Sequence, residues 1–216
     1  MSSKIVSLTL SRGGSKEIPR KNLVDINGHP LIFYVIDAAK KVPAICENWV
    51  SSDCEVILDT ARELGAKTIK RPDELATDEA SSELGILHFA ENVDFDILVF
   101  IQTTSPLITS NFIEAGLNKV MSGEHDSVFS VTKEYWLPRW SKNVEPIDWN
   151  PALRPRRQEI EERYVENGAF YITTRKQLLK SGLRYSGNIG FIEIPLSQSF
   201  GIDTHEDLEL IRKLLK

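Results

Sequence analysis

The amino-acid sequence predicts a three-layer α/β fold with a parallel or mixed β-sheet. Short apolar runs of strand length alternate with segments of helical spacing along most of the chain. The run 97–101 is apolar without interruption, which indicates a strand buried on both faces. With 216 residues, of which 41% are hydrophobic, the chain can bury a sizeable core. We therefore expect one compact domain over residues 1–216, with ligands gathered where the strands end.

The expected elements follow one another from the N-terminus. Apolar and β-branched runs predict strands at 5–10, 49–52, 67–69, 97–101 and 127–131. Amphipathic spacing predicts helices at 31–41, 55–64, 81–91 and 110–120, the last of them with Ser110 as its N-cap. A final helix is expected after Thr204, which would cap it together with Asp207.

The glycine-rich loop that follows the first strand is the most informative segment. Residues 1–22 carry five cationic side chains and one anionic one, an excess of four in a chain of net charge -5. Gly13 and Gly14 let the backbone approach a ligand, and their amides could form an anion-binding concavity. The spacing fits neither a P-loop nor a dinucleotide-binding loop. The loop indicates a nucleoside triphosphate site, with a basic surface turn as the alternative.

Composition and spacing argue against several other classes. Cys46 and Cys54 are too few for a disulfide framework, and the four histidines form no metal-binding spacing. No Ser, His and acid trio is signalled, so a nucleophilic hydrolase is not expected. No apolar run is long enough to span a bilayer, and the N-terminus lacks a signal-peptide pattern. We expect a cytoplasmic protein that binds neither membranes nor nucleic acids.

The sequence resembles the CMP-acylneuraminate synthetases, a family of cytidylyltransferases. The run from Arg12 to Asn22 is similar to the family signature. Further blocks with the same resemblance follow in order along the chain: Arg71–Ser82, Gln102–Leu107, Asn167–Tyr171 and Ile202–Leu208. Ordered blocks spread over nearly the whole chain are far more specific than a single motif.

This resemblance implies a Rossmann-like nucleotidyltransferase fold with a projecting dimerisation arm. The arm would be the irregular segment 133–162, where Trp136, Trp140 and Trp149 could anchor a homodimer interface. Alternatively, the segment is a long loop folded over its own domain, or its arginines 154, 156 and 157 belong to an active site reached across the dimer. Glu159, Glu161 and Glu162 argue against a nucleic-acid patch here.

The resemblance also implies an activity, the transfer of CMP from CTP to the anomeric hydroxyl of a 2-keto-3-deoxy sugar acid with release of pyrophosphate. The acceptor would be an acylneuraminate-type nonulosonate, and Mg²⁺ would accompany the triphosphate. Two alternatives stay open. The acceptor could be an octulosonate such as KDO, or the chain could be a catalytically impaired CTP-binding homologue.

Site residues are carried over from the matching motifs. The nucleotide would be bound by Arg12, Gly13, Ser15, Lys21, Asn22, Arg71 and Ser82, with Arg12 and Lys21 offsetting charge on the departing pyrophosphate. Asp203 would be the metal ligand and a third catalytic residue. The sugar acid would be contacted by Gln102, Thr104, Ser105, Arg157, Gln158 and Asn167. Residues 102–106 could instead be only a strand-to-helix turn, and Asn167 before Gly168 could be only a turn.

Several positions depart from the family pattern. Gly201 stands where many relatives have a second aspartate, which weakens a two-carboxylate metal site, and Ile108 stands where an arginine is frequent. Ser11, Glu17 and Thr103 replace the usual alanine, a small residue and proline. Asp53 could lie near the nucleotide, but we expect it to cap the helix that begins near Glu55.

Overall fold

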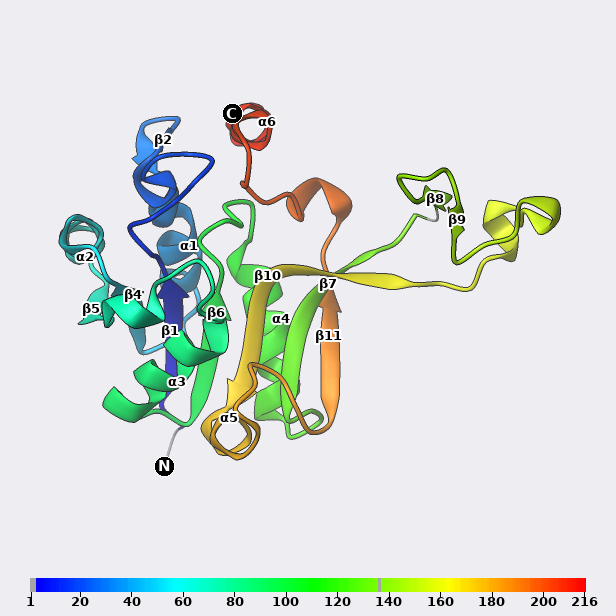
Figure 1. Cartoon of the computed structure of the whole chain (residues 1–216). Coiled ribbons are helices and arrows are strands. Elements are labelled where there is room, and N and C mark those ends of the chain that lie inside the picture. Colours follow the sequence, from blue (N-terminus) through cyan, green and yellow to red (C-terminus); the bar gives the residue numbers. More distant parts are fainter. Residues whose placement is uncertain (1–2, 136) are drawn as a thin grey trace.

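The computed structural model describes residues 3–135 and 137–216 and has a central sheet with strand order β11-β7-β10-β6-β1-β4-β5. The strands occupy the middle layer in Figure 1. Their bounds are β1 Ile5–Leu10, β4 Glu47–Ser52, β5 Lys67–Lys70, β6 Ile97–Ile101, β7 Ser127–Lys133, β10 Tyr164–Thr174 and β11 Ile189–Glu193. The five strands expected from the sequence are present, and β10 and β11 are additional ones.

Most neighbouring strands in the sheet run parallel. β1 pairs in parallel with β4 on one side and with β6 on the other, in a register that places Leu8 opposite Trp49 and Phe100. β10 is antiparallel to both β6 and β7, and its register with β7 shifts between Glu166 and Tyr171. The parallel arrangement brings the carboxyl ends of β1, β4 and β6 to one edge of the sheet, where ligands of such folds bind.

Helices cover both faces of the sheet and complete the three expected layers (Figure 1). One face is covered by α1 (Leu31–Lys40), α2 (Glu55–Glu63) and α4 (Ser110–Met121), whose apolar sides share a buried cluster with β1, β4 and β6. The other face is covered by α3 (Ser82–Asn92) and α5 (Arg175–Ser181), which bury Phe89 and Leu178. α1 to α4 match the expected ranges to within two residues, whereas α5 was not predicted, and Thr109, not Ser110, occupies the N-cap of α4.

A smaller apolar cluster holds the C-terminal helix against the end of the glycine-rich loop. α6 (His205–Leu214) begins at a capping box in which Thr204 and Asp207 hydrogen-bond reciprocally, as expected. Its buried Leu208 and Ile211 pack with Ile18 and with Ile26 of the short β2–β3 hairpin (Asp25–Ile26 and His29–Pro30). The segment 201–204 is thereby fixed beside the loop.

The segment between β7 and β10 projects from the body of the molecule (Figure 1). It contains β8 (Arg139–Trp140), β9 (Pro146–Ile147) and the short 3-10 helices η3 (Pro151–Leu153) and η4 (Arg157–Glu159). Trp140 and Trp149 pack edge to face with ring centroids 5.0 Å apart. Trp136 lies outside the described residues. The segment is therefore not a loop folded over its own domain, while its role in dimerisation stays a prediction.

Within the described part of the chain, no helix combines the length and the apolar character needed to cross a membrane.

Candidate active site

A cavity of about 310 Å³ opens at the carboxyl ends of β1 and β6. One side is formed by the glycine-rich loop (residues 12–22) and the opposite side by residues 71–82, which lead into α3. Residues of the loop that follows β6 complete the wall. The lining residues are Leu10, Arg12, Gly14, Ser15, Lys21, Asn22, Arg71, Leu75, Ala76, Thr77, Asp78, Ala80, Ser81, Ser82, Phe100, Gln102, Thr103 and Thr104. Three motifs that are far apart in the sequence thus meet in one cavity.

Hydrogen bonds hold the glycine-rich loop in its course over the cavity. The Ser11 amide donates to the Ser51 carbonyl at 2.9 Å, which continues the pairing of β1 with β4. The loop ends in the 3-10 helix η1 (Lys21–Leu23), where the buried Asn22 donates from Nδ2 to the Arg12 carbonyl at 2.9 Å. Asn22 therefore lines the cavity as expected. Its side-chain amide also fixes the backbone of Arg12.

Gly13 occupies a crowded position behind the cavity rather than in its lining. A Cβ added there would lie 2.7 Å from Cβ of Cys54, so only glycine fits without a shift. The Gly13 amide donates to Oδ1 of Asp53 at 2.9 Å. The first glycine therefore permits close approach of the loop to β4, and Gly14 is the glycine that faces the cavity.

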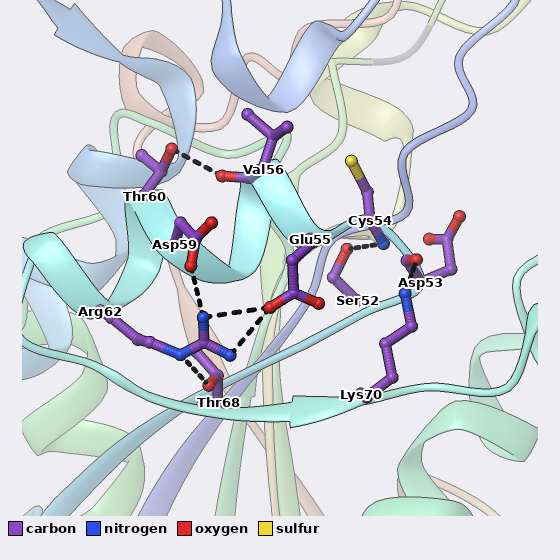
Figure 2. Close-up of polar contacts among 10 residues, drawn as sticks. All are labelled: Ser52, Asp53, Cys54, Glu55, Val56, Asp59, Thr60, Arg62, Thr68 and Lys70. Atoms are coloured by element: carbon purple, nitrogen blue, oxygen red, sulfur yellow. Dashed lines mark hydrogen bonds and ion pairs between the residues drawn. The ribbon is translucent and has the colours of Figure 1, made fainter.

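Asp53 does not cap α2, contrary to our expectation. The N-cap is Cys54, which makes no side-chain cap hydrogen bond. Figure 2 shows the start of α2, where the Cys54 amide donates to Oγ of Ser52 and Lys70 donates to the Asp53 carbonyl oxygen. The Asp53 carboxylate is thus free to accept from the loop, and it joins the end of β4 to the candidate site.

Three of the cationic side chains of the loop are paired with carboxylates. Arg12 Nη2 lies 2.7 Å from Oδ1 of Asp78, and Lys16 Nζ lies 2.7 Å from Oδ2 of the same residue. Lys21 Nζ donates to the Ile202 carbonyl at 2.8 Å and to Oδ1 of Asp203 at 2.9 Å. Both lining cations are accessible from the cavity, so a polyanionic ligand could exchange with these carboxylates.

Arg71 is the most deeply buried charge in the cavity wall. Arg71 is only 5% exposed, and within the described structure its Nε has no hydrogen-bond partner. Burial lowers the pKa of the Arg71 guanidinium, and the neighbouring Asp53 partly opposes that effect. A buried polar atom without a partner at a cavity wall is available to hydrogen-bond a ligand or water.

The floor of the cavity is made by the strand ends and by the first turn of α3. Ser82 is the first residue of α3 and lines the cavity together with Leu10 and Phe100. A Cβ on Gly85, one turn later, would lie 3.0 Å from Nη1 of Arg71, so the absence of a side chain there leaves room for the guanidinium. Leu10 and Phe100 were not among the expected site residues, although both stand at carboxyl ends of predicted strands.

Gln102 and Thr104 line the cavity, as expected of residues that face a substrate. Ser105 does not line it. Ser105 is buried, and its amide donates to the Gln102 carbonyl at 3.1 Å, which closes a turn. The 102–106 segment is therefore a strand-to-helix turn that also presents two polar side chains.

Two departures from the family pattern contact each other at the cavity wall, which Thr103 also lines. Oγ of Ser11 and Oγ1 of Thr103 lie 2.7 Å apart, and Oγ1 of Thr103 also donates to the Leu10 carbonyl. Both residues are buried. Together they join the carboxyl ends of β1 and β6. Ile108, a third departure, is 4% exposed and belongs to the core.

Three residues expected to contact the sugar acid lie apart from the cavity. Asn167 accepts on Oδ1 from Ser130 and donates from Nδ2 to Thr132, so its amide ties β10 to β7 beside the left-handed Gly168. Gln158 is exposed on η4 of the projecting segment. Arg157 lies on the same 3-10 helix, and its side chain is outside the described part of the structure. Their predicted contacts with the acceptor remain predictions.

An aromatic and ionic cluster adjoins the cavity behind Phe100. The Arg184 guanidinium lies 5.7 Å from the ring centroid of Phe100 and 4.9 Å from that of Tyr171, and its Nε is 2.5 Å from Oε1 of Glu83. The Tyr171 hydroxyl donates to Glu166, and burial raises the pKa of Tyr171 well above its usual range. Of these residues only Tyr171 lies in a recognised motif, and no local signal pointed to Arg184.

Asp203 lies beside the cavity but is largely exposed, with 82% of its side chain accessible. Its position is fixed because the adjacent Ile202 amide donates to the Thr104 carbonyl at 2.9 Å. The described residues contain no group of three or more His, Cys, Asp or Glu side chains arranged to hold a metal. One carboxylate suits Mg²⁺ that arrives on phosphate oxygens, because such ions keep several waters and few protein ligands.

Comparison with known proteins agrees with this arrangement. A family model described as "Cytidylyltransferase" matches residues 6–216. The chain is 36% identical over 211 residues to N-acylneuraminate cytidylyltransferase A of Danio rerio, covering 94% of this chain and 49% of that protein. It is 31% identical over 217 residues to the pseudaminic acid cytidylyltransferase of Campylobacter jejuni strain 81-176, covering 95% of this chain and 94% of that protein.

The fold also matches that of solved structures. One is a CMP:2-keto-3-deoxy-manno-octonic acid synthetase complexed with CTP, with a TM-score of 0.76 at 21% identity, covering 99% of this chain and 98% of that one. At this identity the likeness concerns the fold alone. The chain spans about half the length of the Danio rerio relative, 49%.

Proposed function

Since this chain belongs to the cytidylyltransferase family, we propose that it transfers CMP from CTP to the anomeric hydroxyl of a 2-keto-3-deoxy sugar acid. Pyrophosphate is the second product. The acceptor we favour is an acylneuraminate-type nonulosonate, because relatives at 36% and 31% identity are named for N-acylneuraminate and pseudaminic acid.

One observation carries the proposal. The cationic loop, the buried Arg71 and the polar pair Gln102 and Thr104 line a single cavity. Lys21 and Arg12 at one side suit the triphosphate, and Arg71 with Ser82 at the other suits the hydrogen-bond acceptors of a pyrimidine. Gln102 and Thr104 also line the cavity and can hydrogen-bond a hydroxylated acceptor without adding charge.

The reaction requires positioning and charge stabilisation more than covalent chemistry. The anomeric oxygen forms a bond to the α-phosphorus while the bond between the α-phosphorus and the bridging oxygen breaks, and that oxygen leaves with pyrophosphate. Negative charge on the leaving group rises as this bond lengthens. Arg12 and Lys21 line the cavity, so they can stabilise that charge once they exchange Asp78 and Asp203 for phosphate oxygens.

Mg²⁺ is part of the proposal because CTP carries it. Bound to the triphosphate, Mg²⁺ would neutralise phosphate charge and polarise the reacting phosphoryl group. Asp203 is the residue we propose as its protein ligand. The Lys21 ammonium now pairs with that carboxylate and would turn to the phosphates when the nucleotide binds. The proton of the anomeric hydroxyl has no assigned acceptor among the described residues.

We propose a homodimer in which the projecting segment carries acceptor-binding residues to a second copy. The segment exposes large apolar side chains, among them Leu137, Val144 and Leu153, which would be covered at an interface. Arg157 and Gln158 lie on the same segment and could grip a sugar carboxylate there. A cytoplasmic location is also proposed, supported by the free thiols of Cys46 and Cys54.

Product analysis tests this function. Purified protein is incubated with CTP, Mg²⁺ and, separately, an acylneuraminate, pseudaminic acid and an octulosonate, and pyrophosphate and the CMP-sugar are measured. Release with a nonulosonate supports the proposal, and release with the octulosonate alone would identify the alternative acceptor. CTP binding without pyrophosphate release from any acid would contradict the enzymatic function and favour a CTP-binding protein, the reading that Gly201 and Ile108 motivate.

A further inference from the structure

Asp78 occupies the phosphate-binding side of the cavity in the way that a ligand would. Each of its carboxylate oxygens contacts a different cation of the glycine-rich loop, Arg12 at 2.7 Å and Lys16 at 2.7 Å. Arg12 also donates from Nη1 to the carbonyl of the adjacent Thr77 at 3.1 Å. The 71–82 segment is thus joined to the loop mainly through the groups that should hold the triphosphate.

A carboxylate with its two oxygens on two cations makes the charge-assisted contacts that two phosphate oxygens would make with the same cations. A triphosphate that binds Arg12, with the neighbouring Lys16 as an auxiliary cation, must therefore displace Asp78 or share the two cations with it. Sharing would place like charges close together and oppose binding. Arg12 and Asp78 each have 37% of the side chain exposed, so screening does not remove the competition at Arg12, whereas Lys16 is 78% exposed and its pair is screened more strongly.

We propose that Asp78 is an exchangeable internal anion that competes with the phosphates of the substrate and the leaving pyrophosphate for Arg12 and Lys16. The inference rests on the proposed function and deepens it. When CTP binds, its higher charge displaces the single carboxylate. After the bond to the α-phosphorus breaks, pyrophosphate remains on the loop, and the return of Asp78 to the two cations promotes its release.

This role has a consequence that distinguishes it from a structural one. Removing the charge of Asp78 should strengthen the binding of pyrophosphate, whereas removing an ordinary structural ion pair should weaken binding or leave it unchanged. The variant should also show stronger product inhibition by pyrophosphate. Its turnover at saturating CTP should fall while its KM for CTP falls as well, because a tighter complex releases its product more slowly.

The test measures the affinity of magnesium pyrophosphate for wild type, Asp78→Asn and Glu79→Gln by isothermal titration calorimetry. Glu79 is the matched control, since it is the next residue, is exposed and forms no ion pair within the described part of the chain. We expect Asp78→Asn to bind pyrophosphate roughly threefold to tenfold more tightly, as two partly exposed ion pairs permit. Glu79→Gln should bind it as wild type does.

Pyrophosphate binding by Asp78→Asn that is equal to or weaker than that of wild type would overturn the inference. The same gain in affinity for Glu79→Gln would also overturn it, because the overall charge of the protein would then explain the gain. Absence of pyrophosphate binding in all three proteins would also overturn it. The titration needs no turnover. Failure of the proposed function appears separately, as wild-type protein that releases no pyrophosphate from CTP with any sugar acid.

Discussion

The nucleotide side of the molecule and its acceptor side differ in how they are assembled. On the nucleotide side, the motifs that follow β1, β5 and β6 meet in one cavity, and most of their polar side chains already have partners. On the acceptor side, Gln158 lies on the projecting segment and Asn167 ties β10 to β7. A single chain therefore brings the proposed nucleotide-binding residues together, but only Gln102 and Thr104 of the proposed acceptor-binding ones.

This difference follows from topology. Parallel strands end at the same edge of the sheet, so short motifs that directly follow them lie close together without further long-range contacts. The acceptor motifs follow an antiparallel strand and an excursion of about thirty residues, for which no such geometric rule exists. The contrast teaches that the convergence of the proposed nucleotide-binding residues is a property of the sheet, whereas the sheet does not set the position of the proposed acceptor residues on the projecting segment.

Replacing Arg12 should give the largest effect on activity, because Arg12 lines the proposed nucleotide cavity. Arg12→Ala removes charge that stabilises the departing pyrophosphate, and we expect turnover to fall roughly 10²- to 10³-fold. Pyrophosphate release under saturating CTP measures this effect. Arg20→Ala is the control, because Arg20 belongs to the same loop, is exposed and does not line the cavity. Equal rates for Arg12→Ala and wild type would remove Arg12 from the mechanism.

Mixing two impaired variants, assayed at a sugar-acid concentration well below the raised KM, tests whether the acceptor side is completed by a second copy. Arg157→Ala should raise KM for the sugar acid about tenfold or more while leaving KM for CTP unchanged. If Arg157 acts on the partner's cavity, co-refolding it with Arg12→Ala should recover up to about a quarter of wild-type activity, since statistically formed mixed dimers contain one intact site. No recovery above the sum of the separate variants would place Arg157 outside a shared site.

A smaller effect is expected from Asp203, which stands at the border of the two sides. Asp203→Asn removes one anionic oxygen ligand and should raise the Mg²⁺ concentration for half-maximal activity severalfold. Asp207→Asn is not a suitable control because it breaks the capping box, but Glu206→Gln in the same turn is exposed and uninvolved. Metal titration of pyrophosphate release decides the matter, and identical curves for Asp203→Asn and wild type would make the aspartate purely structural.

The smallest effect concerns the hydrogen bond between Ser11 and Thr103, which joins the carboxyl ends of β1 and β6. Ser11→Ala and Thr103→Val each remove one hydroxyl of a buried hydrogen bond and should lower the free energy of unfolding by about 1 kcal/mol. Because each variant leaves the other hydroxyl without this partner, the double variant should cost less than the sum. Urea unfolding of the four proteins provides the cycle. Strict additivity would show that the two hydroxyls contribute independently.

Much of the fold could be predicted from the sequence. The range 5–10 and the range 97–101 coincide with β1 and β6, because each is a continuous apolar run between clear turn signals. β10 escaped prediction as a strand since its bulge and its polar start, Tyr164 to Gly168, interrupt the apolar pattern. The capping box of Thr204 and Asp207 was recognisable because it depends only on local spacing.

The candidate site was less predictable where a side chain has two possible partners. Asp53 was expected to cap α2, but the crowded approach of Gly13 provides a better donor for its carboxylate. Asp78 stood inside a recognised motif without an assigned role, because its partners lie more than sixty positions earlier in the chain. Such long-range pairings leave no periodic signal, so they emerge only when the sheet brings the loops together.

The central claim is that the loop after β1 binds the triphosphate of CTP, and a crystal structure of the protein with CTP and Mg²⁺ tests it most directly. The account predicts phosphate oxygens on Arg12 and Lys21, the cytosine against Arg71 and Ser82, and Asp78 displaced from Arg12. A nucleotide bound elsewhere, with Arg12 still paired to Asp78 and the cavity empty, would contradict it.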